Sequence, residues 1–131
     1  MNIFKLFKPA LNKTELVITS AIEEHLSESD KLIFRHQLLL VYDVERDPTG
    51  HENLFTWAAP GKTRRRYPEK KFEITEPSFK LATVVFYLHN RILTADLWLN
   101  KGAIFCYRYS SSSEASEVLN DYTIESVTVY L

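Results

Sequence analysis

The hydrophobic pattern of this chain is clearest from Phe79 to Tyr109, where apolar, β-branched and aromatic residues dominate. Breaks fall at His89-Asn90 and at Asn100-Lys101-Gly102, so the run predicts three consecutive β-strands. The second break resembles a tight hairpin loop in which Gly102 takes a positive φ after a type I turn. A meander of this kind is a scaffold, and it names no substrate by itself.

A helical pattern precedes this run. Ile18, Ile22 and Leu26 recur at i, i+4 and i+8, and Asn12 or Thr14 has the side chain of an N-cap. The pattern therefore predicts a helix that ends near Leu26. Because its other face is polar, we expect this helix to lie across one face of a sheet.

Residues 31–46 alternate between two sets of side chains. Leu32, Phe34 and Leu38 fall in one set, while Ile33 and Leu39 fall in the other. Alternation with period two is typical of a strand. The stretch predicts a long strand, covered on both faces where residues 38–41 are all apolar.

Turn residues divide the next segment. Asp47-Pro48-Thr49-Gly50 has the residues that a type I turn prefers, so residues 53–58 are expected to return antiparallel to the preceding strand. A second turn, at Ala59-Pro60-Gly61-Lys62, fits type II. Residues 63–67 and 72–75 then predict an edge strand that Pro68 interrupts.

The C-terminal part predicts a short helix over residues 114–119 and a last strand over residues 122–131. The complete pattern predicts an α+β fold. One N-terminal helix packs on a curved, mostly antiparallel sheet of six or seven strands, with the short helix before the last strand. A nucleotide-binding α/β architecture is not expected, because strands and helices do not alternate.

Composition narrows the class of protein. The 131 residues are expected to form a single domain, and the net charge of −1 draws the chain neither to nucleic acid nor to acidic membranes. Cys106 is the only cysteine, which excludes an internal disulfide. Since the sequence shows neither a signal peptide nor an 18-residue apolar segment, we expect a cytoplasmic protein without a membrane span.

No motif for a nucleotide, a metal or a catalytic serine is present, and we expect no cofactor or metal. The four histidines are far apart in sequence. His36, Tyr42 and Asp96 remain candidates for acid–base or ligand-binding groups, provided that His36 and Asp96 face one cavity. Asp96 otherwise fits a solvent-facing position, and Cys106 fits a small buried thiol better than a nucleophile.

The sharpest surface feature is the stretch from Lys62 to Lys71, which holds six basic residues and one acid. It can dock an acidic protein surface, grip phosphates, or protect a sheet edge from aggregation. Trp57 lies opposite its start across the Pro60-Gly61 turn. The predicted partner-binding residues are Trp57, Lys62, Arg64, Arg65, Arg66, Tyr67, Lys70 and Lys71.

These features favour a non-enzymatic protein that binds a macromolecular partner, such as an inhibitor, an immunity-type protein or an adaptor. The expected partner is a protein with an acidic surface, and a homodimer through a sheet edge stays open. One alternative is a small-ligand-binding or isomerase-like enzyme with a cavity between helix and sheet. A weaker alternative is nucleic-acid binding through residues 62–71.

Overall fold

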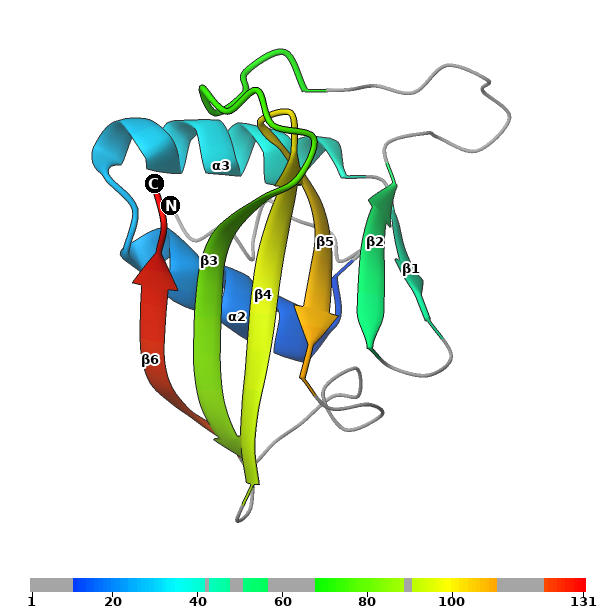
Figure 1. Cartoon of the computed structure of the whole chain (residues 1–131), viewed down its shortest axis with the longest axis vertical. Helices are drawn as coiled ribbons and strands as arrows, with labels where there is room; N and C mark the ends of the chain where they lie inside the picture. The colour runs from blue at the N-terminus through cyan, green and yellow to red at the C-terminus, as the bar shows by residue number, and fades with distance from the viewer. Residues whose placement is uncertain (1–10, 42, 48–50, 57–67, 89–90, 111–121) are drawn as a thin grey trace.

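The computed structural model describes residues 11–41, 43–47, 51–56, 68–88, 91–110 and 122–131. These residues form two helices and a six-stranded antiparallel sheet, which is an α+β fold (Figure 1). The helices are α2 (Lys13–Glu24) and α3 (Glu28–Leu40). The strands are β1 (Asp43–Arg46), β2 (Glu52–Thr56), β3 (Phe79–Leu88), β4 (Arg91–Asn100), β5 (Ala103–Tyr109) and β6 (Tyr122–Val129).

Helix α2 confirms the predicted first helix. Asn12 is its N-cap and forms a capping box with Glu15, in which each side chain accepts the other residue's backbone N–H at 2.8 Å. The helix ends at Glu24, and Ile18 and Ile22 are fully buried.

Helix α3 corrects the prediction of a long strand over residues 31–46. Within that stretch only β1 is a strand, and the remainder of the stretch up to Leu40 is helical. Ser27 begins the helix, because its side chain accepts the backbone N–H of Asp30 at 3.2 Å. The predicted single N-terminal helix is therefore a pair of helices.

The predicted meander is confirmed as β3, β4 and β5, and the predicted last strand is confirmed as β6. The β4–β5 loop differs in detail, since Lys101 and Gly102 have φ values of 47° and 83°. Two positive values are typical of a type I′ turn, which matches the twist of a hairpin better than the expected type I turn. A Cβ on Gly102 would lie 2.2 Å from the carbonyl oxygen of Phe72, so this position requires glycine.

Residues 72–75 are not the predicted edge strand. They belong to an irregular segment that crosses the β4–β5 turn, where the Phe72 N–H donates to the Gly102 carbonyl at 3.0 Å. Buried Phe72 joins the core from this segment, which explains its apolar character without a strand. The expected strand over 63–67, most of the two predicted turns and the short helix over 114–119 lie outside the described residues.

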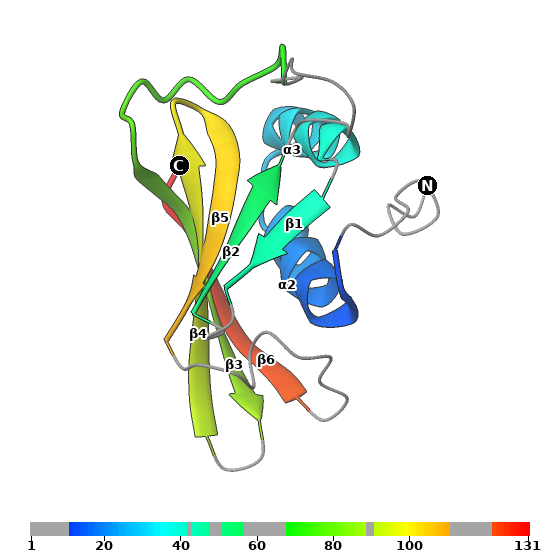
Figure 2. The ribbon, with the colours of Figure 1, turned by 90° about the vertical axis from the view of Figure 1, so that its right-hand side faces the viewer.

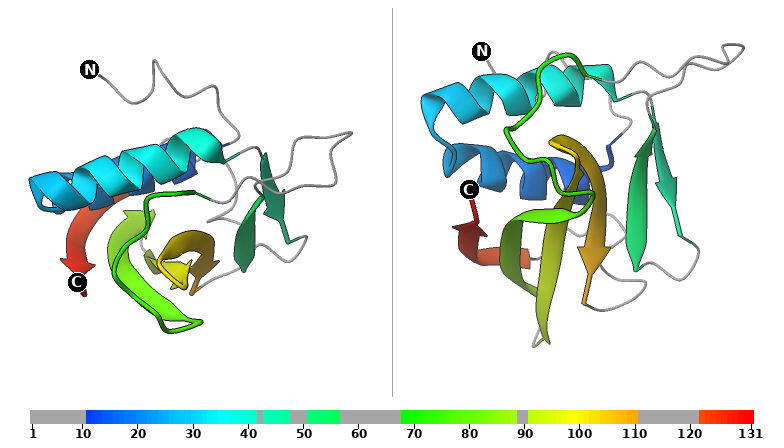
Figure 3. Two further views of the ribbon diagram at one scale, coloured as in Figure 1. Left: turned by 90° about the horizontal axis from the view of Figure 1, so that it is seen from above. Right: turned by 45° about the horizontal axis from the view of Figure 1, so that its top comes forward.

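The sheet has the strand order β1-β2-β5-β4-β3-β6 and is open, with β1 and β6 as its edges. Both helices lie on one side of it (Figures 2 and 3). On that inner face, Leu93, Ala95, Leu97 and Leu99 of β4 are buried with α2 and α3. We call the opposite face, which the helices leave uncovered, the outer face.

Candidate functional site

Most of the predicted basic edge lies outside the described residues. This holds for Trp57, Lys62, Arg64, Arg65, Arg66 and Tyr67, and also for the candidate Tyr42. Lys70 and Lys71 are described, and both are exposed beside the β4–β5 turn. The backbone there is fixed, because the Gln37 side chain donates to the Lys70 carbonyl at 3.0 Å.

His36 and Asp96 do not come together. His36 lies on α3, on the inner side of the sheet, and is half-buried. Its Nε2 atom is buried and has no hydrogen-bond partner among the described residues. Asp96 alternates with the buried residues of β4 and therefore faces outward, as expected for its solvent-facing interpretation.

The outer face carries a group of aromatic and charged side chains that extends across β3, β4 and β5 and includes Tyr130, the residue that follows β6. Trp98 of β4 lies between two cations: Lys80 Nζ is 5.5 Å and Arg108 Cζ is 5.1 Å from its ring centroid. Lys80 is also 5.8 Å from the ring of Tyr130. We call this set the outer-face cluster. Its members are Lys80, Thr83, Asp96, Trp98, Arg108 and Tyr130.

Ion pairs and hydrogen bonds fix the cluster in place. Asp96 lies 3.6 Å from Lys80 and accepts a hydrogen bond from Thr83 at 2.6 Å. Tyr130 donates to the same Thr83 hydroxyl at 2.9 Å. Arg108 pairs with Glu52 at 2.9 Å, yet its side chain stays 50% exposed, and that of Lys80 is 37% exposed. The cations are thus held in position and remain accessible.

Trp98 has one unsatisfied group. Its indole Nε1 is buried and has no acceptor among the described residues. Buried N–H donors are seldom left unpaired in native proteins, because losing water without a partner costs about 1–3 kcal/mol. The unpaired Trp98 N–H therefore distinguishes this cluster from an ordinary arrangement of charged surface residues.

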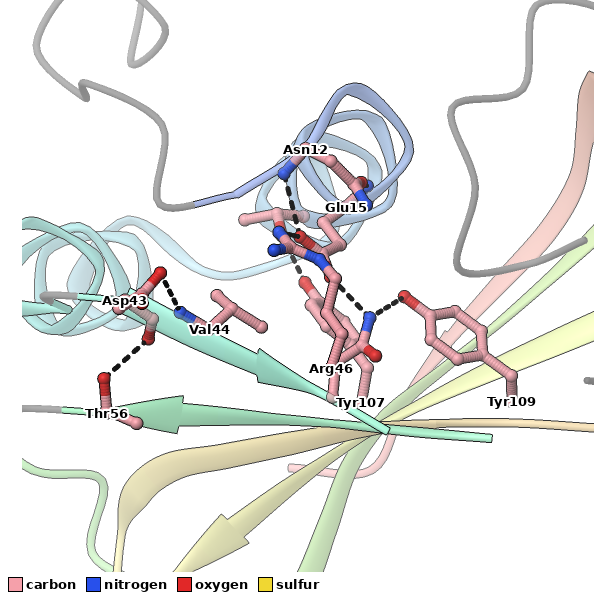
Figure 4. A network of polar contacts seen from close by, with 10 residues as sticks. Asn12, Glu15, Asp43, Val44, Arg46, Thr56, Tyr107 and Tyr109 are labelled. Carbon is pink, nitrogen blue, oxygen red and sulfur yellow. Dashed lines mark hydrogen bonds and ion pairs between the residues drawn. The ribbon is translucent and has the colours of Figure 1, made fainter. Parts of the chain in front are cut away.

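A second polar group is buried on the inner face (Figure 4). The carboxylate of Glu15, at the start of α2, is fully buried and lies 2.6 Å from Arg46 Nη2 of β1. The Asn53 amide of β2 donates to Glu15 and, at 3.4 Å, to the Tyr109 hydroxyl. We call Glu15, Arg46, Asn53, Tyr107 and Tyr109 the buried polar cluster.

Tyr107 and Tyr109 line the sheet side of this cluster. Burial raises the pKa of both phenols, and the nearby Glu15 charge acts in the same direction. The Tyr107 hydroxyl is hydrogen-bonded to Thr19 of α2. The Asn53 Oδ1 atom is buried without a partner among the described residues. Hydrogen bonds and an ion pair join Glu15 and Thr19 of α2 to Arg46, Asn53 and Tyr107. The cluster therefore connects α2 to β1, β2 and β5.

A groove of about 510 Å³ opens beside the buried polar cluster. Arg46 and Tyr109 belong to its wall. Its lining residues are Glu45, Arg46, Asp47, His51, Glu52, Leu54, Arg108 and Tyr109. The groove is open to solvent and mixes acids with bases. Its lining includes no residue of α2 or α3. A smaller groove, of about 320 Å³, does lie between α2 and β6, on the side where the ligand-binding alternative expects a cavity.

Neither cluster was recognised from the sequence as a unit. Arg46 and Asn53 lie on either side of the predicted Asp47–Gly50 turn and pair in the β1–β2 register, so their proximity had a local signal. The sequence gives no local signal that Glu15 and Tyr109 join this pair, since both come from distant segments of the chain. Lys80, Trp98 and Arg108 become neighbours only through the register of β3, β4 and β5.

Cys106 is buried on β5, opposite Trp98 of β4 and Leu54 of β2. Burial raises the pKa of its thiol to about 12, with a smaller contribution from Glu52. A thiol with this pKa is protonated at neutral pH and is a poor nucleophile. The position agrees with the structural interpretation of this residue.

Within the described ranges, no three His, Cys, Asp or Glu side chains are placed to share a metal ion. The helices of that same part of the chain are too short or too polar to cross a membrane. Comparison with models of known protein families, with curated protein sequences and with solved protein structures found no match.

Proposed function

We propose that this chain is a non-enzymatic cytoplasmic protein that binds a protein partner through the outer-face cluster. The observation that carries the proposal is Trp98, held between Lys80 and Arg108 on a sheet face that neither helix covers. Trp, Tyr and Arg dominate the residues that supply binding energy at protein interfaces. All three occur here within one cluster.

The charges favour a partner with acidic residues at its surface. Lys80 and Arg108 keep much of their surface exposed, so carboxylates of a partner can reach both cations. An arginine fork binds a carboxylate through two parallel hydrogen bonds, which adds geometric specificity. Removing water from the Trp98 ring would add an apolar contribution at the same place.

The basic stretch from Lys62 to Lys71 extends this proposal. Its described basic residues, Lys70 and Lys71, lie beside the turn that follows β4, the strand of Trp98. Nucleic-acid binding through residues 62–71 remains a separate prediction. A steep loss of affinity with salt would distinguish it, because phosphate contacts release counterions.

The experiment is quantitative affinity capture from a lysate of the source cells, compared between variants. We expect Lys80→Glu with Arg108→Glu, and separately Trp98→Ala, to recover the partner at least about tenfold less than the wild type. The matched control is Lys13→Glu with Lys31→Glu, which makes the same change of charge on α2 and α3.

Circular dichroism shows whether each variant is folded before capture. The proposal is supported if the control variant retains the partner and the outer-face variants lose it. It is wrong if every protein captured by the wild type is captured equally by the folded outer-face variants.

A further inference from the structure

Within the described part of the chain, strand β6 has no neighbouring strand on one of its two sides. It pairs with β3 and forms an edge of the sheet. The Tyr130 N–H donates to the Leu81 carbonyl of the β3 side at 2.9 Å. Because backbone groups alternate along an antiparallel strand, Thr128 also faces β3, while Val127 and Val129 direct their N–H and C=O groups away from it.

The two edges of the sheet differ in how they discourage further pairing. β1 is four residues long and three of them are charged, which is how natural proteins protect an edge. β6 is eight residues long, and Glu125 is its one charged residue. Its remaining residues include three Thr or Ser and two Val. The β6 edge is therefore a template that can accept another strand.

An apolar groove runs beside this edge, on the inner face. It holds about 320 Å³ between α2 and β6. The lining residues are Val17, Ser20, Ala21, Glu24, His25, Ile124 and Val127. A strand that pairs with β6 would direct every second side chain toward the inner face and into this groove.

The shape of the molecule favours a single extended segment over a second copy of the chain. The end of α2 and its connection to α3 project beyond β6, over the space that a new strand would enter (Figures 1 and 3). In a two-fold dimer through β6, the same projection of the other copy would need that space as well. A single peptide strand has no such projection and would therefore not compete for that space.

The charges around the groove indicate that its occupant carries a basic side chain. Glu24 lines the groove and is exposed, and Glu125 is exposed on the edge strand itself, where it accepts a hydrogen bond from Tyr87. The basic side chain in the lining is His25, whose Nδ1 is bonded to the Ala21 carbonyl at 2.9 Å. A segment with Lys or Arg beside its aliphatic residues fits these acids.

We propose that the β6 edge and its groove bind an extended segment of a protein partner by strand addition. The segment has aliphatic residues at alternate positions, which enter the groove, and at least one Lys or Arg. Backbone hydrogen bonds to Val127 and Val129 would supply affinity, and the groove would supply specificity. This site uses the β6 edge and the inner face, whereas the outer-face cluster lies on the opposite face of the sheet, and the proposal stands independently of that cluster.

The probe is the acetylated, amidated heptapeptide Lys-Val-Thr-Val-Thr-Val-Lys, titrated into the complete chain and followed by amide NMR. We expect shifts concentrated at Val127, Val129, Ile124 and Ala21, and at least about tenfold slower hydrogen exchange at the two valines. The control peptide is methylated on alternate backbone nitrogens, which removes the donors that pair with β6. It should not bind.

Two variants test the two parts of the site. Val127→Pro removes an outward N–H without removing a bond to β3, and Ala21→Arg fills the groove and repels a basic segment. Each should weaken binding of the peptide at least about tenfold. Leu32→Arg, at a 64% exposed position of α3, is the matched control and should bind like the wild type.

The proposal is overturned if millimolar peptide leaves the β6 amides unchanged, if the shifts map elsewhere, or if the methylated peptide binds equally well. It is also overturned in favour of a second copy if the same amides shift with protein concentration when no peptide is present. None of these results depends on the partner of the outer-face cluster, so the two proposals fail separately.

Discussion

Glu15 shows how a single residue joins separate parts of this fold. Its carboxylate has no exposed surface, and three groups compensate for the lost water: the Asn12 N–H, the Arg46 guanidinium and the Asn53 amide. A buried charge without partners would cost several kcal/mol. The position is therefore stable only when β1 and β2 are docked against the start of α2.

Arg46→Ala should lower the free energy of unfolding by about 3–5 kcal/mol, because it leaves the Glu15 charge buried and poorly paired. Arg46→Lys should lower it less, since it restores the charge and loses the planar fork. Chemical denaturation measures both. Lys31→Ala is the control: its partner Glu28 has a side chain that is 93% exposed, so less than about 1 kcal/mol should be lost. Equal losses in Arg46→Ala and Lys31→Ala would contradict this account of Glu15.

Cys106 should resist thiol reagents in the native protein. Burial raises its pKa from 9.0 to about 12, so the thiolate fraction at neutral pH falls by about a thousandfold, and the reagent must also reach a buried atom. We expect modification by an aromatic disulfide reagent, followed by absorbance, to be more than about a hundredfold slower than in denaturant. Comparable rates in both conditions would revive the nucleophile hypothesis.

At the scale of elements, Gln37 connects three segments. Its Nε2 donates to the carbonyls of Lys70 and Gly102 at 3.0 and 2.9 Å, and its Oε1 accepts the Ile104 N–H at 2.8 Å. The side chain is fully buried. Helix α3 thereby holds both the irregular segment over residues 68–76 and the β4–β5 turn.

Gln37→Leu should destabilise the protein by about 1–3 kcal/mol, because the buried Ile104 N–H loses its acceptor and the carbonyls of Lys70 and Gly102 each lose a donor. Gln37→Glu keeps the acceptor for Ile104 and loses the donors at neutral pH, which separates the two contributions. Leu39→Ala, on the exposed side of the same helix, should change stability by less than about 1 kcal/mol. Thermal and urea denaturation measure these differences, and a stable Gln37→Leu variant would show that the three segments hold together without this side chain.

Gln37 also explains why the sequence pattern of α3 predicts a strand. The buried residues Phe34, Gln37, Leu38 and Val41 follow i, i+3, i+4 and i+7, the spacing of a helix face. Gln37 is polar, so the helical period of buried positions is not visible as a hydrophobic pattern. Leu32 and Leu39 are apolar but exposed, and they complete a period-two alternation that resembles a strand. Ser27 with Asp30 was the local signal for a helix start.

The meander could be predicted because its information is local. Each of its strands is a β-rich run beside the next one, and Gly102 marks the second hairpin. The outward position of Asp96 followed from alternation in the same way. The pairing of Glu15 with Arg46, or of Trp98 with Arg108, depends on which distant segments become neighbours, and hydrophobic periodicity carries no information on that.

At the scale of the whole molecule, the core and the two proposed binding sites lie on different parts of the sheet. The inner face holds the core and the buried polar cluster, which ties the helices to β1, β2 and β5. Neither α2 nor α3 covers the outer face, and among the described strands β6 pairs on one side alone. Binding at either place would leave the core undisturbed, which fits the proposed role of holding a partner.

The buried tyrosines make the stability of the whole molecule sensitive to alkali. Burial raises the pKa of Tyr107 and Tyr109 above their ordinary value of 10.0, and the Glu15 charge adds to this. In the unfolded chain both phenols lose their protons near pH 10, while the native state retains them. The native state then binds more protons than the unfolded state, so the free energy of unfolding must fall as pH rises. Below about pH 9 this contribution is fully present.

We therefore expect the free energy of unfolding to decrease from about pH 10 upward by up to about 1.4 kcal/mol per pH unit for each buried tyrosine. Urea denaturation at a series of pH values measures the slope, and tyrosinate absorbance should show these phenols ionising only with unfolding. Tyr107→Phe removes one titrating group and should make the slope shallower, although the loss of the Thr19 hydrogen bond lowers stability at every pH. A slope that stays the same in this variant would mean that the alkaline transition arises elsewhere in the molecule.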